Sequence, residues 1–149
     1  MSAPTEALMA ALAETKAEIA RTDNKTALLL AFVGAVLAGT WSVAKDLPLN
    51  TGALVVGGAG LAVLVAAAGM LLRAVRPNLR GRNGFPLWAT LTAEEITTEM
   101  AARDLAADVA GLSRLAVAKF TTLRRAVDLT TAGCALLILA ALLTLGGAA

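Results

Sequence analysis

The stretch from Thr26 to Ala44 reads TALLLAFVGAVLAGTWSVA and contains no charged residue. Its length is close to the ~20 apolar residues with which a helix crosses a ~30 Å hydrocarbon core. Two further uncharged apolar runs follow, at 51–72 and 129–149. Because lipid offers no hydrogen-bond partners to the backbone, each run is expected to be a helix. The sequence therefore predicts an all-α integral membrane protein with three transmembrane helices.

The composition supports a membrane class and excludes several kinds of chemistry. Of the 149 residues, 58% are hydrophobic, which exceeds the roughly 45–50% of a soluble domain. The chain has no His and only Cys134, so His-based catalysis, a His-ligated metal and an internal disulfide are excluded. A net charge of +2 gives no strong field for nucleic acid. We expect no enzymatic activity, no cofactor, no metal and no nucleic-acid partner.

Basic residues near the ends of the runs predict the orientation. Lysines and arginines cluster in residues 1–25 and 73–128, whereas the hairpin at 45–50 has only Lys45. Such residues are enriched on the cytoplasmic side of membrane proteins. We therefore expect the N-terminus and residues 73–128 in the cytoplasm, and the hairpin and the C-terminus outside.

The two predicted cytoplasmic segments carry helical patterns. In residues 1–25, apolar or small residues from Leu8 to Thr22 recur at alternating spacings of four and three, so we expect one long helix that passes into the first span. In residues 73–128 a loop comes first, and Thr92 with Glu95 then forms a capping-box pattern. From this start an apolar stripe follows at Leu105, Val109, Leu112, Ala116, Phe120, Leu123 and Val127. We therefore expect one helix that begins at Thr92 and runs on into the third span.

Each stripe is too narrow to form a domain alone. We expect the two segments to pack into a small cytoplasmic helical region, across subunits of a homo-oligomer. Pairs of small residues four apart in the spans would allow close helix packing. They are Ala35 with Gly39, Ala53 with Gly57, and Gly58 with Ala62.

Six arginines at the predicted cytoplasmic face have two interpretations. Their positions fit topology and attraction to anionic lipid, and their guanidinium groups also suit a phosphate ligand. Trp88 could stack on a nucleotide base or anchor the chain at the membrane interface. The candidate ligand-binding residues are Arg73, Arg76, Arg80, Arg82, Trp88, Arg124 and Arg125.

Asp23 lies directly before the first span, where the preference for basic residues does not explain it. Asp23 and Lys25 are two positions apart on a helix and so do not face each other. Asp23 is either solvated or paired with a basic residue of the other cytoplasmic segment. Lys119, Arg124 and Arg125 are the candidates for such a structural ion pair.

The order of these motifs resembles a known family. The chain has Asp23-Asn24-Lys25 before TALLLAF, then Arg76-Pro77, then Leu87-Trp88, and finally GLSRLAVAKFTTLRRAVDL at 111–129 before the last span. This arrangement is similar to the Pycsar effector transmembrane family, the membrane effectors of bacterial anti-phage defence that uses cyclic pyrimidine nucleotides. The resemblance covers about residues 17–143.

The resemblance implies a partner cyclase that makes cyclic CMP (cCMP) or cyclic UMP (cUMP) on infection. It also implies that the chain resides in the bacterial inner membrane, senses this nucleotide and impairs the membrane. The alternative is a constitutive membrane scaffold or small-channel subunit with no nucleotide ligand.

Overall fold

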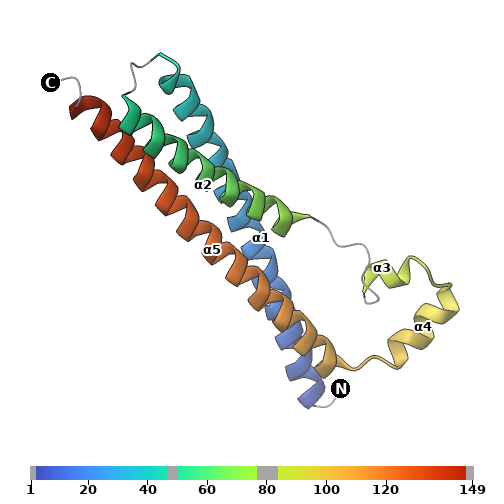
Figure 1. The fold of residues 1–149 in the computed structure, drawn as a ribbon. Helices are drawn as coiled ribbons and strands as arrows, with labels where there is room; N and C mark the ends of the chain where they lie inside the picture. Colours follow the sequence, from blue (N-terminus) through green and yellow to red (C-terminus); the bar gives the residue numbers. More distant parts are fainter. Residues whose placement is uncertain (1–2, 47–49, 77–83, 147–149) are drawn as a thin grey trace. The chain divides into compact units, whose positions relative to one another are not determined.

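The computed structural model describes residues 3–46, 50–76 and 84–146, and these residues form helices and no strand (Figure 1). The elements are α1 (Ala3–Ala44), α2 (Thr51–Val75), α3 (Phe85–Trp88), α4 (Ala93–Ala101) and α5 (Leu105–Gly146). Three of them, α1, α2 and α5, are long and apolar enough to cross a membrane. The predicted fold class, an all-α protein with three transmembrane helices, is confirmed.

The helices form two compact units. The first unit comprises the described residues of 1–19 and 76–116, so it holds the start of α1, the short helices α3 and α4, and the start of α5. The second unit comprises the described residues of 20–75 and 117–149, and in it α1, α2 and α5 lie side by side (Figure 1). Helices α1 and α5 therefore have residues in both units.

Helix α1 is continuous from Ala3 to Ala44, as the sequence predicted. Its inward positions keep the alternating spacing of four and three well beyond Thr22. They are Leu8, Leu12, Thr15, Ile19, Thr22, Thr26, Leu29, Val33, Val36 and Thr40, all buried or half-buried. An average repeat of 3.5 residues is that of a left-handed coiled coil, in which one seam of each helix faces its partners.

Helix α5 has the same repeat, which corrects the predicted stripe. Phe120 and Val127 are 41% and 44% exposed, whereas Ala126 is fully buried. From Ala116 the inward positions are instead Lys119, Leu123, Ala126, Thr130, Gly133, Leu137, Ala140 and Thr144. The prediction followed the large apolar side chains, but close helix packing places small residues on the seam.

The helix predicted from Thr92 onward is two helices. The predicted capping box is present, since the Glu95 amide donates to the Thr92 hydroxyl and the Thr92 amide donates to the Glu95 carboxylate. Helix α4 nevertheless ends at Ala101, and Asp104 begins α5 by accepting from the Ala106 and Ala107 amides at 2.9 and 3.1 Å. An aspartate at this position satisfies amides that the first turn leaves unpaired. The third span is the far end of α5, as expected.

The core of the second unit takes side chains from all three long helices. Val33 of α1, Leu64 and Leu71 of α2, and Ala126 of α5 are fully buried together. Burying such side chains away from lipid gains packing rather than hydrophobic free energy, because the lipid chains are equally apolar. Close fit is therefore what holds this core.

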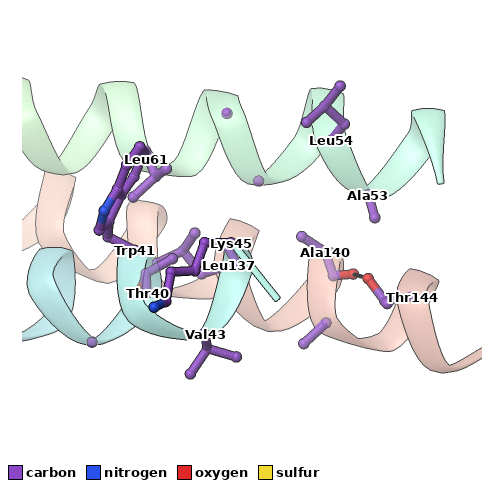
Figure 2. A pocket seen from close by; sticks show the side chains of 15 residues that line it. Thr40, Trp41, Val43, Lys45, Ala53, Leu54, Leu61, Leu137, Ala140 and Thr144 are labelled. Carbon is purple, nitrogen blue, oxygen red and sulfur yellow. Dashed lines mark hydrogen bonds between the residues drawn. The ribbon is translucent and has the colours of Figure 1, made fainter. Parts of the chain in front are cut away.

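The closest fit is between α2 and α5, at Gly60 and Gly133. A Cβ atom on Gly133 would lie 2.7 Å from Leu64 Cγ, and one on Gly60 would lie 3.1 Å from the Gly133 carbonyl oxygen. Gly57 also faces Ala140, so the predicted Ala53–Gly57 pair lies in this interface (Figure 2). The other two predicted pairs, Ala35 with Gly39 and Gly58 with Ala62, are exposed.

Asn50 joins the start of α2 to the end of α5. Its side-chain oxygen accepts from the Ala53 amide at 2.8 Å, and its side-chain nitrogen donates to the Leu143 carbonyl at 2.9 Å. A helix leaves its first four amides and last four carbonyls without partners inside the helix. One side chain thus satisfies an unpaired group of each helix.

The close fit at Gly133 predicts that a large side chain there destabilises the protein more than the same side chain at Gly34. Gly133→Leu should lower the unfolding midpoint in detergent, because the added side chain overpacks against Leu64, at a cost of about 1–3 kcal/mol. Gly34→Leu is the matched control, since a Cβ atom there meets nothing within 4 Å. Thermal unfolding followed by circular dichroism measures both. Equal midpoints for the two variants would show that α2 and α5 do not approach closely at Gly133.

Candidate functional site

The first unit contains a cavity of about 620 Å³, within the ~300–1,000 Å³ range of small-molecule pockets. Its walls come from α1, α3, α4, α5 and the residues between α4 and α5. The lining residues are Lys16, Gly84, Leu87, Trp88, Glu99, Met100, Arg103, Ala107, Asp108, Gly111, Leu112 and Leu115. One wall is thus apolar, while two cationic and two carboxylate side chains supply the polar groups.

Trp88 reaches this cavity through a local turn that depends on Gly84. Gly84 has a φ of 70°, a conformation that glycine adopts without the clash that a Cβ atom causes. Its carbonyl accepts from the Leu87 and Trp88 amides, both at 3.1 Å, which begins the one-turn helix α3. Trp88 is half-buried at the end of that turn and lines the cavity.

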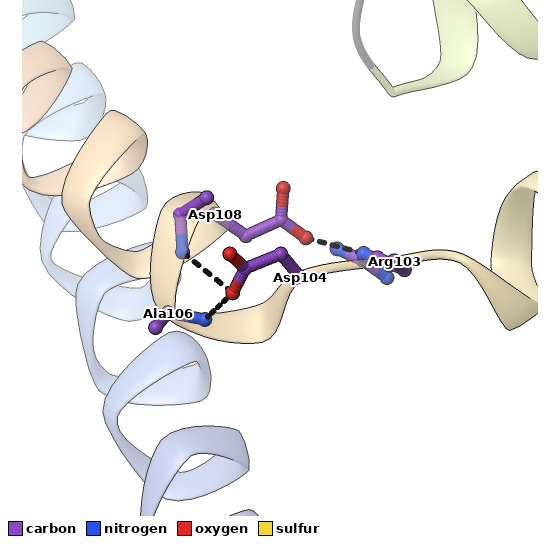
Figure 3. A network of polar contacts seen from close by, with 5 residues as sticks. Arg103, Asp104, Ala106 and Asp108 are labelled. Atoms are coloured by element: carbon purple, nitrogen blue, oxygen red, sulfur yellow. Dashed lines mark hydrogen bonds and ion pairs between the residues drawn. The ribbon is translucent and has the colours of Figure 1, made fainter.

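Arg103 is held in place by the residues that begin α5 (Figure 3). Its Nε donates to the carboxylate of Asp108, and the two side chains are 32% and 34% exposed. Asp104 fixes the backbone between them through its bonds to the first turn of α5. A guanidinium has five N–H donors, so the bond from Nε leaves four donors for a ligand.

The predicted arginines do not gather around this cavity. Arg73, Arg124 and Arg125 belong to the second unit, and Arg76 belongs to the first unit but does not line the cavity. Arg80 and Arg82 lie outside the described residues. Among the described residues, Trp88 is the one predicted ligand-binding residue that lines the cavity.

Sequence reasoning missed the cations that do line the cavity, Lys16 and Arg103. The available signal was Asp104 directly before Leu105, a typical helix-capping residue before an apolar-periodic run. That signal would have split the predicted helix and placed Arg103 in a connection. Lys16 carried no comparable signal, because it lies within a continuous helix.

The second unit contains an ion pair between Asp23 and Lys119. Lys119 Nζ donates to Asp23 Oδ1 at 2.5 Å, and the side chains are 25% and 49% exposed. Lys119 was one of three candidate partners, and it lies on the inward seam of α5. Lys25, the other ion-pair candidate, is exposed and is not part of this pair.

The described residues contain no group of three or more His, Cys, Asp or Glu side chains that could hold a metal ion. Cys134 is a half-buried free thiol on α5. Neither feature adds a reactive centre to the cavity.

Comparison with known protein families identifies the relationship. The family model of the Pycsar effector protein domain matches residues 7–146. The chain belongs to the Pycsar effector family. Neither the comparison with curated proteins nor the comparison with solved structures finds a match.

Membership gives the general role. The chain is a membrane effector of Pycsar anti-phage defence, and the family implies a cyclic nucleotide signal made by a partner cyclase. The matched segment includes both units, so the cavity lies within the Pycsar effector domain itself.

The Asp23–Lys119 pair predicts that the stability of the protein depends on opposite charges at these two positions. Lys119→Asp should lower the unfolding midpoint by placing two carboxylates together, and Asp23→Lys combined with Lys119→Asp should restore it. The coupling should be about 0.2–1 kcal/mol, because both side chains retain contact with solvent. Thermal unfolding at low and high salt measures it. Arg125→Asp, at an exposed position, is the control. A double variant no more stable than Lys119→Asp alone would contradict the pairing.

Proposed function

We propose that this effector binds a cyclic pyrimidine nucleotide, cCMP or cUMP, in the first-unit cavity, and that binding leads to impairment of the inner membrane. The observation that carries the proposal is that Trp88, Arg103 and Lys16 line one cavity of suitable size in a Pycsar effector domain. These side chains match the two parts of such a ligand, a flat base and an anionic phosphate.

The recognition follows from general chemistry. An aromatic ring stacks on a base with about 1–3 kcal/mol, whichever base it is. Arginine presents a planar set of donors that suits a phosphate, and lysine adds a point charge. Because Asp108 already holds Nε of Arg103, the guanidinium is oriented before the ligand arrives. This reduces the entropy lost on binding.

Helix α5 connects the cavity to a predicted membrane span and so offers a route by which binding affects the membrane. α5 lines the cavity with Asp108, Gly111 and Leu112 and continues without a break to Gly146. A ligand shifts such a helix only if it binds the shifted packing more tightly than the resting one. We infer that cyclic-nucleotide binding repacks α5 against α1 and α2.

Membrane damage requires more than one copy. The three spans are uncharged, and polar groups inside a membrane are what mark an ion pathway. Three such helices packed on one another do not enclose a channel. We propose a homo-oligomer, which exposed small residues of the spans outside that packing, such as Ala35 and Ala62, would suit. The effector would act without catalysing a reaction.

The first test is nucleotide binding by the purified chain. The parent should bind cCMP or cUMP more tightly than cAMP or cGMP in calorimetry. Trp88→Ala and Arg103→Ala should each weaken binding about tenfold, equivalent to ~1.4 kcal/mol. Arg76→Ala is the matched control, because Arg76 does not line the cavity.

The outcomes separate the alternatives. Loss of affinity in Arg76→Ala with no change in Arg103→Ala would move the phosphate site to the predicted arginine cluster. Absence of binding for all four nucleotides would favour the constitutive scaffold or channel subunit. In cells with the nucleotide supply, dye uptake should fall in the same variants that lose affinity, and continued uptake without binding would contradict nucleotide control.

The second test concerns orientation, with residues 1–25 and 73–128 proposed to be cytoplasmic and the C-terminus external. In a Cys134→Ala background, an impermeant maleimide should label Asp46→Cys in intact cells and spare Glu94→Cys. Both positions are exposed, so accessibility in the folded chain does not bias the comparison. Labelling of Glu94→Cys before lysis would show that the topology is the reverse of the one proposed.

A further inference from the structure

The second unit contains a groove that the nucleotide proposal does not use. It lies where the last turns of α1 meet the first turns of α2 and the last third of α5, and its volume is about 600 Å³ (Figure 2). Small residues create it, because Gly39, Gly57, Gly58, Ala140 and Ala141 leave unfilled space between the helices. All three helices are long and apolar enough to span a membrane, so this space adjoins lipid.

The groove wall is mostly apolar, and one cationic side chain lines it. Leu54, Leu61 and Leu137 supply much of the wall. The hydroxyl of Thr144 donates to the Ala140 carbonyl at 2.9 Å, so its proton is already used within α5. Lys45, one residue beyond the end of α1, contributes the ammonium group.

The residues around Lys45 match a membrane–water interface. Trp41 lines the groove and is 72% exposed, and such tryptophans are typical at the level of lipid headgroups. Lys45 lies 3.8 Å from Asp46, but the side chains are 59% and 75% exposed. A pair this exposed is weak and leaves the ammonium able to bind a phosphate.

Size decides between a lipid chain and a second copy of the protein. A helix with its side chains is about 10 Å across and rises about 5.4 Å per turn, so this volume holds little more than one turn. A lipid acyl chain is narrow enough to lie along the groove. In a phospholipid the glycerol that carries this chain also carries a headgroup phosphate, which pairs with an ammonium. A second apolar span offers no such anion.

We propose that the groove binds one acyl chain of a membrane phospholipid, with the headgroup phosphate at Lys45. The bound chain fills the space between the end of α1 and the α2–α5 pair. This site shares no lining residue with the proposed nucleotide cavity, since its lining residues all belong to the second unit.

The test uses native mass spectrometry of the full chain with added phosphatidylglycerol, and with diacylglycerol as the phosphate-free analogue. The parent should retain one phosphatidylglycerol per chain. Gly58→Leu should reduce retention about tenfold, because its side chain enters the groove. A Cβ atom at Gly58 meets nothing within 4 Å, so the variant should still fold. Gly69→Leu, equally open on α2 but outside the groove, should retain the lipid.

Lys45→Gln separates the headgroup from the chain. This variant should bind phosphatidylglycerol no more tightly than diacylglycerol, whereas the parent should prefer phosphatidylglycerol several-fold. Unchanged retention in Gly58→Leu, or no retention by the parent, would overturn the proposal. Loss of oligomer mass in Gly58→Leu with unchanged lipid retention would instead make the groove a contact between copies of this chain.

Discussion

The fold rests on a repeat of 3.5 residues that both 42-residue helices maintain from end to end. The inward positions of α1 run from Leu8 to Thr40, and those of α5 run from Leu105 to Thr144. In water this seam is favoured by burial of apolar surface, whereas in lipid only close fit and satisfied polar groups favour it. The seam carries leucines such as Leu8 and Leu12 near the start of α1, and small residues such as Ala126, Gly133 and Ala140 in the later part of α5.

The most deeply buried polar residues on the seam, Thr22, Thr26 and Thr130, are compatible with this environment because each has a partner. Thr26 is 3% exposed and donates to the Thr22 carbonyl, and Thr130 is 4% exposed and donates to the Ala126 carbonyl. Lys119 interrupts the apolar side of α5 but meets Asp23 of α1. A carboxylate and an ammonium at one level fix the register of the two helices more strictly than alanines and leucines do, since apolar contacts tolerate a shift.

Much of the fold could be predicted from the sequence, because lipid imposes simple requirements on length and hydrogen bonding. Residues 26–44 are long, apolar and uncharged, which predicts a transmembrane helix. Thr92 with Glu95 predicted a helix cap from side-chain chemistry alone. The predicted stripe failed at Phe120 and Val127, since size and apolarity do not show which face packs most closely. The cavity could not be predicted, because Lys16 and Arg103 are 87 positions apart and come together only through folding.

The two hydrogen bonds of Asn50 constrain how α5 can move. Its amide joins the first turn of α2 to Leu143, so axial sliding of α5 would break the bond, whereas tilting about that point would preserve it. Leu143 then acts as a pivot and the rest of α5 as a lever arm. Lys119 lies 24 residues away, about 36 Å along the helix, so a tilt of about 3° displaces it by about 2 Å. With the lysine side chain unchanged, a displacement of this size along the line from Nζ to Oδ1 would lengthen the Asp23–Lys119 contact from 2.5 Å to beyond the ~4 Å limit of an ion pair.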